Sequence, residues 1–514
     1  MKMTPQKQWR NFFHFRTFRS VYCLFVATLI IVCSGEASGN LKEKMIAVGK
    51  QEPGTTLFQK SIQISPDQAH VTYVTKKGEQ MIVAVDAKAD NGRWSKVVAG
   101  TPVFSAYGNR VAYIAADQKQ AYVVVDGKPG PAFDYIWDVK FSPDGKYFAY
   151  PAVIGTGNKK KVFLVINHKK GKQVFGITQF RFSRDSKNLA YIGLLEDGKW
   201  HLILNNKVMP GYDLVESIVF SPDSKHVAYT IQEQNKKTVV LDSKRMAFPG
   251  IQVGMTSFSP DSLRLAYAVL NKDGKWEVIV DNKKIAAVKK AFGFLFSPDS
   301  KKFAFQGGEE TDNLSMYVNG VQSPVYSGCS DPYYSPDSSK LAYFAKQGSK
   351  WFMVVNGKAD PSFHTVFPPI FSNDSSHMAY RVKIDDDKMC VVYDGKPGEI
   401  YENVGTPIFS NDGKHIAYVV QKDNKWVFLI DGKKGKVYDG LGTFAFSDDG
   451  KHFAYTALRN GNWLLVIDGN ETTTTFNQTI PNASIKYTSS NNLHLLILQM
   501  DGDMPKLFRL EVAF

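Results

Sequence analysis

A unit of ten residues with a fixed order of polar and apolar positions recurs along most of the chain. In residues 220–229 an aromatic residue precedes Ser-Pro-Asp, and an apolar run then ends in Ala-Tyr. Successive copies begin about 37 to 41 residues apart, which is the spacing of propeller blades. The clear copies are residues 141–150, 182–191, 220–229, 258–267, 296–305, 334–343, 371–380, 409–418 and 446–455. Weaker copies begin at Ile64 and Phe104, and a degenerate one begins at Tyr487.

Each repeat contains three turns that separate four short apolar segments. Ser221 to Ser224 forms the first turn, because Pro fixes φ and the Ser and Asp side chains accept hydrogen bonds from the turn's own amides. A polar turn follows at Glu233 to Lys236, and a third at Asp242 to Lys244. Several other repeats place Asp-Gly or Asn-Gly in the third turn, which is a strong hairpin signal. We predict four antiparallel strands per repeat and little helix, since no sustained 3.6-residue periodicity follows the N-terminal segment.

The predicted fold is therefore an all-β β-propeller of about twelve four-stranded repeats. Twelve blades exceed the roughly four to eight of an ordinary ring. Our first choice is two tandem propellers of about six blades each, over residues 40–290 and 291–514; seven plus five blades and one large ring are the alternatives. The last repeat lacks one strand, which residues 45–48 ahead of the first repeat are placed to supply. Such closure by both termini would remove exposed sheet edges.

The first 39 residues have the order of a targeting segment. A basic stretch precedes the apolar run 21–33, and small residues follow it, as in a signal peptide. The alternative is an uncleaved membrane anchor, because the basic stretch is long. We predict a periplasmic or extracellular protein, anchored to the membrane if the segment is retained. Cys329 and Cys390 remain beyond this segment, and we interpret them as unpaired or buried thiols.

The formal net charge of +14 changes this picture little. The lysines are scattered singly over many turns, often beside Asp, which is typical of a solvated surface. A nucleic-acid groove would need a clustered basic stripe with aromatic stacking partners. We therefore predict no nucleic-acid partner.

The aspartate of the repeated motif is interpreted as a structural turn residue, because a catalytic residue is needed once and a turn residue in every blade. These residues are Asp144, Asp223, Asp261, Asp299, Asp337, Asp412 and Asp449. The seventh motif position holds His in five copies and Lys, Arg, Asn or Tyr in others, so we interpret it as a solvated strand start and not a metal site. The histidines are His70, His226, His377, His415 and His452.

No catalytic, cofactor-binding or metal-binding residue is predicted. The acidic run at Asp385 to Asp387 admits calcium as an alternative, but its spacing is not that of an EF-hand loop. Five tryptophans open the third strand of their repeats, and we expect them and the motif Phe residues to pack between blades. The tryptophans are Trp200, Trp276, Trp351, Trp426 and Trp463.

The consensus Phe-Ser-Pro-Asp-Ser/Gly-Lys-x-x-Ala-Tyr resembles the WD40-like β-propeller repeat of the TolB-like family. The resemblance covers roughly residues 58–514. TolB-like proteins carry a separate α/β domain before the propeller, whereas here only about 25 residues separate the targeting segment from the first copy. The resemblance implies an exported bacterial propeller that presents loops to other proteins.

We predict an exported scaffold that binds a protein or a cell-envelope component, without catalysis, and that meets the membrane only through an uncleaved N-terminal segment. The alternative is a carbohydrate-active lyase or glycosidase whose site lies in the propeller channel. Because the motif braces every blade, function is expected where copies depart from it. The candidates are residues 155–158, the turn around Asp385, the region of Cys329 and residues 471–484.

Overall fold

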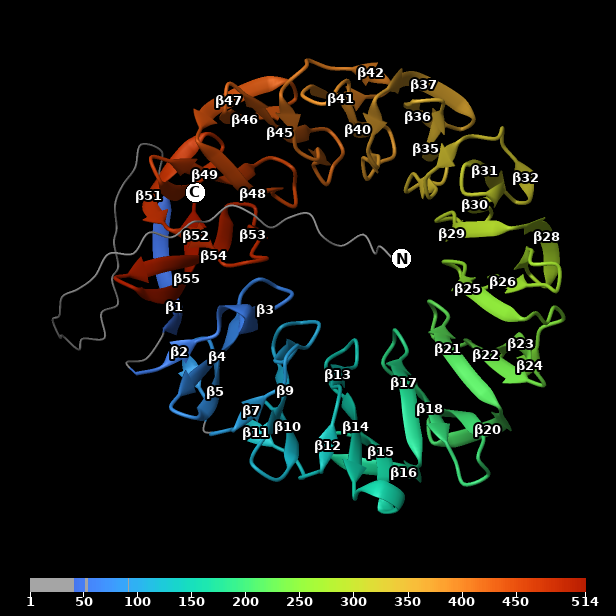
Figure 1. Ribbon diagram of the computed structural model, residues 1–514. Helices are drawn as coiled ribbons and strands as arrows, with labels where there is room; N and C mark the ends of the chain where they lie inside the picture. The colour runs from blue at the N-terminus through green and yellow to red at the C-terminus, as the bar shows by residue number, and fades with distance from the viewer. Residues whose placement is uncertain (1–40, 51–53, 91) are drawn as a thin grey trace. The chain divides into compact units, whose positions relative to one another are not determined.

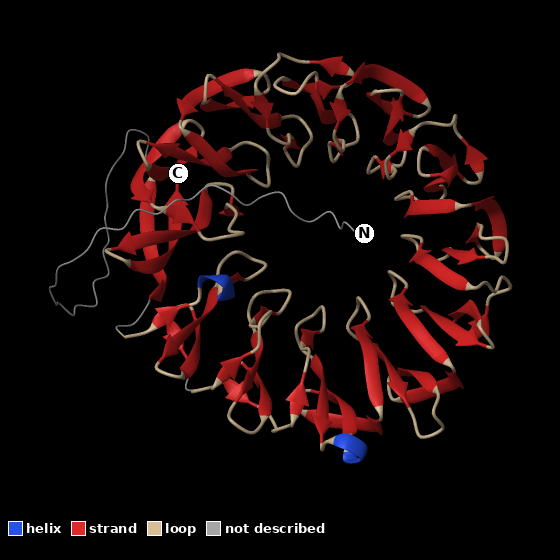
Figure 2. Ribbon diagram, in the orientation of Figure 1, coloured by secondary structure: helices blue, strands red, loops and turns tan. Residues whose placement is uncertain are grey.

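The computed structural model describes residues 41–50, 54–90 and 92–514. This part of the chain is all-β, and its strands form twelve small sheets arranged in a ring, a twelve-bladed β-propeller (Figure 1). Helix is limited in these residues to two single 3₁₀ turns, η1 (Gln59–Ser61) and η2 (Gly157–Lys159) (Figure 2). The predicted targeting segment, residues 1–39, lies outside the described residues.

The fifth sheet shows the plan of every blade. Its strands β21 (Leu214–Phe220), β22 (Val227–Glu233), β23 (Lys236–Leu241) and β24 (Lys244–Arg245) pair antiparallel in chain order, as predicted. The first strand of a blade lies nearest to the ring centre, and the fourth lies at the rim (Figure 1). Because antiparallel strands alternate in direction, the motif turn and the third turn lie at the same end of the sheet.

The other blades repeat this order, and in seven of the twelve sheets the first strand is split into two short strands that pair with the same second strand. The remaining first strands are β2 (Thr56–Leu57) with β3 (Gln63–Ile64), β7 (Lys96–Val97) with β8 (Val103–Phe104), β12 (Tyr135–Ile136) with β13 (Lys140–Phe141), β17 (Gly176–Phe182), β25 (Gln252–Phe258), β29 (Lys290–Phe296), β33 (Gly328–Cys329) with β34 (Tyr333–Tyr334), β38 (Thr365–Val366) with β39 (Ile370–Phe371), β43 (Asn403–Val404) with β44 (Ile408–Phe409), β48 (Gly440–Phe446) and β52 (Gln478–Thr479) with β53 (Lys486–Ser489).

The remaining second strands are β4 (Val71–Lys77), β9 (Val111–Ala116), β14 (Phe148–Ile154), β18 (Leu189–Leu194), β26 (Leu265–Leu270), β30 (Phe303–Glu310), β35 (Leu341–Gln347), β40 (Met378–Lys383), β45 (Ile416–Lys422), β49 (Phe453–Arg459) and β54 (Asn492–Asp501). The remaining third strands are β5 (Gln80–Val85), β10 (Ala121–Val125), β15 (Lys161–Ile166), β19 (Trp200–Leu204), β27 (Trp276–Val280), β31 (Asn313–Val318), β36 (Lys350–Val355), β41 (Met389–Tyr393), β46 (Lys425–Ile430), β50 (Asn462–Ile467) and β55 (Met504–Ala513).

The remaining fourth strands are β6 (Lys88–Ala89), β11 (Lys128–Pro129), β16 (Lys169–Val174), β20 (Lys207–Tyr212), β28 (Lys283–Val288), β32 (Val321–Gln322), β37 (Lys358–Phe363), β42 (Lys396–Pro397), β47 (Lys433–Tyr438), β51 (Asn470–Phe476) and, in the last blade, β1 (Lys42–Lys50). We number the blades 1 to 12 in chain order, from the sheet that begins with β2 to the sheet that begins with β52 and contains β1.

A strand from the start of the described chain completes the last blade. β1 pairs antiparallel with β55 and forms the outer strand of blade 12. The buried Glu43 ties this strand to blade 11, because its two carboxylate oxygens accept backbone N–H bonds from Thr473 and Thr474, each at 2.8 Å. The prediction that residues 45–48 supply the missing strand is confirmed.

The ring closes between blade 12 and blade 1. Leu507 of blade 12 shares a buried core with Tyr73 and Val71 of blade 1. Gly49 lies so close to this core that an added Cβ would stand 2.8 Å from a methyl group of Leu507. The side chain of Arg509 donates a hydrogen bond to the carbonyl of Ala69 at 3.0 Å. The last blade thus packs on the first as any blade packs on the next.

The two tandem propellers expected over residues 40–290 and 291–514 are not seen. Blades 6 and 7, on either side of that boundary, are packed neighbours, with Val278 and Phe294 in one buried core. Each blade of a repeat protein contacts only its neighbours. The number of blades in a ring therefore depends on the angle between adjacent blades, which the repeat spacing does not reveal.

The Tyr that ends the motif lies deeper in the blade interfaces than the Phe that begins it. Tyr229 is 1% exposed, whereas Phe220 is only partly buried. Phe220 still packs against the core between blades 4 and 5, as expected for the motif Phe residues, but its ring keeps some contact with solvent because the first strand borders the ring centre. Four repeated tryptophans pack against inter-blade cores as expected, namely Trp200, Trp276, Trp351 and Trp463.

Candidate binding surface

The motif aspartates lie in the turns between first and second strands. In blade 5 the Ser221 hydroxyl donates to Asp223 Oδ1 at 2.6 Å, and the Lys225 N–H donates to the same oxygen at 3.1 Å. The hydrogen bond from Ser221 is the main reason that the pKa of Asp223 lies below its ordinary value. The same serine-to-aspartate bond occurs at Asp144, Asp261, Asp299, Asp337, Asp412 and Asp449.

These turns also join neighbouring blades. The backbone N–H of Asp223 donates to the Ser262 hydroxyl of the next motif at 2.9 Å. Corresponding bonds run from Asp144 to Ser186, Asp185 to Ser224, Asp261 to Ser300, Asp299 to Ser338 and Asp337 to Ser375. The donors and acceptors of these turns are therefore engaged in the framework of the ring.

The side chain at the seventh motif position is paired with the third turn of its own blade. His226 Nδ1 lies 2.5 Å from Asp242 Oδ2, and the other carboxylate oxygen accepts the Val227 N–H at 2.9 Å. Arg264 pairs with Asp281 in the same way, and it also donates to a backbone carbonyl of the next blade. The position is a partly exposed strand start, as interpreted, and its pairing with the third turn also clamps two turns together.

The five motif histidines lie on separate blades, each beside its own aspartate. The pairs are His70–Asp86, His226–Asp242, His377–Asp394, His415–Asp431 and His452–Asp468. Among the residues that the structure describes, no three His, Cys, Asp or Glu side chains are grouped so that they could hold a metal ion.

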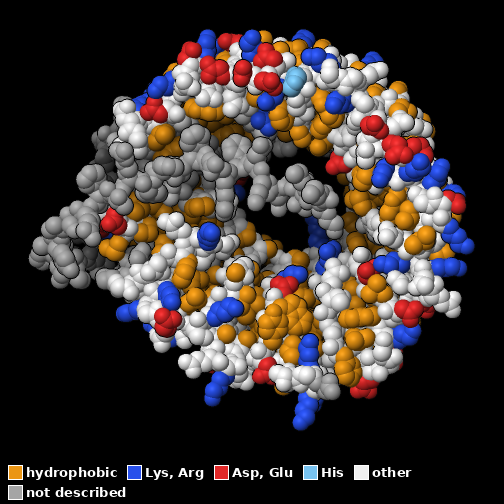
Figure 3. Space-filling view, viewed as in Figure 1, with side chains coloured by type: hydrophobic (Ala, Val, Ile, Leu, Met, Phe, Trp, Pro, Cys, Tyr) orange, Lys and Arg blue, Asp and Glu red, His pale blue; other side chains and the backbone are white. Residues whose placement is uncertain are grey.

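The strands around the ring centre carry exposed hydrophobic side chains in a few blades. In blade 3, the rings of Tyr135 and Trp137 stack at 6.0 Å between centroids with 22° between their planes. Tyr135 is 59% exposed and Trp137 is 37% exposed. In blades 6 and 7, Met255 and Phe292 are also exposed on the first strands. Figure 3 shows hydrophobic side chains along parts of the inner border of the ring.

These side chains stand at two adjacent variable positions that precede the motif aromatic residue. Trp137 and Phe292 each lie four residues before the motif aromatic, and Met255 lies three residues before it. Other blades have small or polar residues there, such as Thr178 in blade 4 and Gly405 in blade 10. The sequence does contain these hydrophobic residues ahead of the motif, but an alignment of the ten motif residues alone leaves out the positions that precede them.

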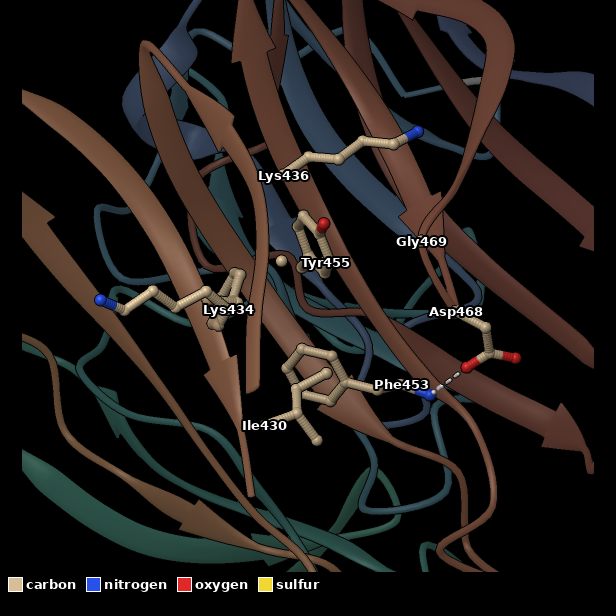
Figure 4. Close-up of a pocket in the computed structure, with 9 residues that line it drawn as sticks. Ile430, Lys434, Lys436, Phe453, Tyr455, Asp468 and Gly469 are labelled. Atoms are coloured by element: carbon tan, nitrogen blue, oxygen red, sulfur yellow. Dashed lines mark hydrogen bonds between the residues drawn. The ribbon is translucent and has the colours of Figure 1, made fainter. Parts of the chain in front are cut away.

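Shallow pockets between blades follow from the repeat. The pocket between blades 10 and 11 holds about 380 Å³ and is lined by Lys434, Lys436, Phe453 and Tyr455 (Figure 4). Pockets at the corresponding place occur between blades 1 and 2, 3 and 4, and 7 and 8. A feature that recurs at several interfaces is better explained by blade geometry than by one ligand.

The segments in which single repeats depart from the motif, and where function was expected, do not come together in one site. Asp385 lies in an exposed second turn, where Lys388 approaches it at 3.7 Å. Cys329 and Cys390 are free and buried, as interpreted, and burial raises the pKa of Cys329 to about 12. The segment 471–484 begins with Glu471, which Arg459 binds through two hydrogen bonds, and it belongs to the junction with blade 12.

Within residues 41–514, the described part contains no helix with the length and apolar character to cross a membrane. The apolar run 21–33 lies outside the described residues.

No family model matches the chain, and no curated protein matches it in sequence. Solved structures match it at low identity. A eukaryotic initiation factor matches at 13% identity and a TM-score of 0.33, over 72% of this chain and 96% of its own. TolB from Acinetobacter baumannii matches at 14% identity and a TM-score of 0.23, over 58% of this chain and 82% of its own.

Kuenenia stuttgartiensis hydrazine synthase matches at 14% identity and a TM-score of 0.22, over 62% of this chain and 99% of its own. The likeness to TolB is a resemblance of propeller repeats and extends to fold alone. None of these proteins indicates what this chain binds.

Proposed function

We propose that this protein is a non-enzymatic binding scaffold whose partner is another protein, held against the first strands of blades 3, 6 and 7. The observation that supports this best is the stacked and exposed pair of Tyr135 and Trp137. Tyr and Trp are enriched among the few residues that carry most of the energy of protein interfaces. Isolated exposed apolar residues are ordinary, but a stacked aromatic pair beside the opening of a ring is a good anchor for a partner.

The rest of the framework favours binding over catalysis. The repeated Asp and His side chains, the obvious candidates for acid–base chemistry, are engaged in turns and inter-turn pairs. A carbohydrate-active enzyme would need unlike polar groups from several blades to converge in the channel. Here the variable inner positions of blades 3, 6 and 7 are hydrophobic instead.

We further propose that the protein is exported and acts in the cell envelope or outside the cell. The support is the order of basic, apolar and small residues in the first 39 residues. Cell fractionation with N-terminal sequencing of the mature protein tests this point. A cytoplasmic protein with an intact N-terminus would contradict it.

Affinity capture from the cell envelope tests the binding function. We expect the wild-type chain to recover a specific protein, and the double variant Tyr135→Thr/Trp137→Thr to recover at least about tenfold less, as for loss of a hot spot. Val321→Thr is the matched control, since Val321 is 73% exposed on the outer strand β32.

The double variant Met255→Thr/Phe292→Thr shows whether blades 6 and 7 contribute to the same interface. Equal recovery by the wild type and both double variants would overturn the assignment of the surface. If no partner were recovered and the protein turned over a glycan, the binding-scaffold proposal would give way to the alternative of a lyase or glycosidase.

A further inference from the structure

The chain contains three repeated sets of lysines that differ in their ion pairing. Lysines in the motif turn lie beside the motif aspartate of their own blade, as Lys225 does at 3.8 Å from Asp223. The other members with this pairing are Lys146, Lys301, Lys414 and Lys451. Each of these lysines faces a negative charge within the same turn.

The second set lies in the second turns, at the opposite end of the blades. Lys199 pairs with Asp213 at 2.6 Å, and Lys425 pairs with Asp439 at 2.5 Å. Lys275 reaches Glu309 of the next blade at 3.8 Å. Much of the positive charge at this end of the blades is therefore balanced locally.

The third set, which we call the rim lysines, has no such partners. Each rim lysine is the exposed first residue of a fourth strand in one of blades 1 to 11. The rim lysines are Lys88, Lys128, Lys169, Lys207, Lys244, Lys283, Lys358, Lys396 and Lys433. For the part of the chain that the structure describes, no ion pair or side-chain hydrogen bond involves any of the nine.

The third turn explains why these lysines stay unpaired. Asp242 lies two residues before Lys244, but both its carboxylate oxygens are engaged: one lies beside His226 Nδ1 and the other accepts the Val227 N–H. In blades 3, 4 and 8 the corresponding turn residue is an uncharged Asn: Asn167, Asn205 and Asn356. The Lys side chain therefore has no free carboxylate partner in its own turn.

The ring places these charges together, although they are far apart in the sequence. All nine occupy the same position of the outermost strand, at the end of the blade where the motif turns lie. Equivalent positions in a ring of equivalent blades lie at one level around the rim. The scattered lysines of the sequence thus form a circle of unpaired positive charge on one face.

We propose that this face docks on a membrane surface that carries anionic lipid headgroups. A circle of charges at one level matches a flat anionic surface, to which many lysines can be presented at once. Lysines held near such a surface each add to the attraction, and the attraction fades within about a Debye length. Nucleic acid fits less well, because the nine fourth strands concerned begin without an aromatic residue on which bases could stack.

Vesicle flotation of the full chain tests this proposal. One set of vesicles contains phosphatidylcholine alone, and in the other about a third of the lipid is phosphatidylglycerol. We expect stronger binding to the anionic vesicles, and a loss of the difference when the salt concentration is raised to about 0.5 M. The N-terminal segment is common to all variants and both vesicle types, so it does not account for a difference between variants.

Two matched variants identify the face that binds. The rim variant replaces Lys128, Lys169, Lys207, Lys244, Lys283 and Lys358 by Gln. The control variant replaces Lys199, Lys236, Lys275, Lys350, Lys388 and Lys425 by Gln, which removes the same charge from the opposite face. We expect the rim variant to partition onto anionic vesicles at least about tenfold more weakly, and the control variant to change little.

Equal losses in the two variants would overturn the proposal, because net charge and not the rim would then govern binding. No preference of the wild type for anionic vesicles would also overturn it. Thermal unfolding of each variant checks that the ring is intact. Partner capture through Tyr135 and Trp137 uses a different surface, so either proposal can fail without the other.

Discussion

Blade 3 and blade 10 have the same framework and different inner surfaces. In blade 3 two short strands, β12 and β13, pair with β14, and in blade 10 the corresponding strands β43 and β44 pair with β45 in the same register. Between the short strands lie residues 137–139 in blade 3, which are Trp-Asp-Val, and residues 405–407 in blade 10, which are Gly-Thr-Pro. The same framework is therefore built with an aromatic residue in blade 3 and with glycine in blade 10, where an added Cβ at Gly405 would stand 2.3 Å from Val419 Cγ1.

The largest effect on the framework shared by both blades is expected from removal of the closing strand. Deleting residues 41–50 exposes the edge of β55 and removes the buried side chains of Leu41 and Val48, each worth about 1.5–3 kcal/mol. We expect a loss of several kcal/mol in the free energy of unfolding, measured by urea denaturation. Lys44→Ala, on the exposed side of the same strand, is the control. An unchanged midpoint after the deletion would show that closure does not stabilise the ring.

The second largest effect is expected at the buried end of the motif. Tyr229→Ala should cost about 3–5 kcal/mol, because the ring is buried between blades, whereas Phe220→Ala should cost clearly less. Tyr229→Phe should be close to neutral, because the buried hydroxyl has no hydrogen-bond partner among the described residues. If Phe220→Ala lowered the free energy of unfolding more than Tyr229→Ala does, the first strand and not the second would carry the main core residue of the blade.

Acid should weaken the same framework in a defined pH range. Hydrogen bonds from serine hydroxyls lower the pKa of the motif aspartates, to about 2 for Asp449. Because these values lie below the ordinary pKa of Asp near 4, their contribution to stability is complete above about pH 4 and is lost as the pH falls toward about 2. The urea midpoint should decline over this range, and Asp449→Asn should reduce the decline. A midpoint that is constant from about pH 4 to 2 would contradict this origin of stability.

The smallest effect on stability is expected from exchanging the inner surfaces. Trp137→Thr gives blade 3 the residue type that blade 4 carries at the same position, Thr178. Since Trp137 is 37% exposed, we expect a cost of about 1–2 kcal/mol, from the lost stacking on Tyr135 and from the buried part of the indole ring. A cost above about 3 kcal/mol would mean that the aromatic pair supports the blade, and its exposure would then say little about a partner.

The repeat could be predicted from sequence because its signals are local. Turn residues such as Pro222 and the Asp-Gly pairs fix the hairpins, and the missing last strand pointed to residues 45–48. The sequence could not decide between two rings and the alternative of one large ring, since the angle between adjacent blades sets the number of blades and the repeat spacing does not reveal that angle. The pairing of His226 with Asp242 was within reach, because both positions recur about 16 residues apart in most blades. The rim lysines emerge only when the blades are arranged in space.

The pairing of β1 with β55 also fixes the order of events during synthesis. The outer strand of blade 12 is made before any blade, but its partner is made last, so β1 must remain unpaired until more than 450 residues have followed it. Until the following blade is made, each new blade has one sheet face that no neighbour covers. A chain that stops short of β55 leaves β1 without a partner strand, which distinguishes it from a finished ring for any protease or chaperone that binds free strands.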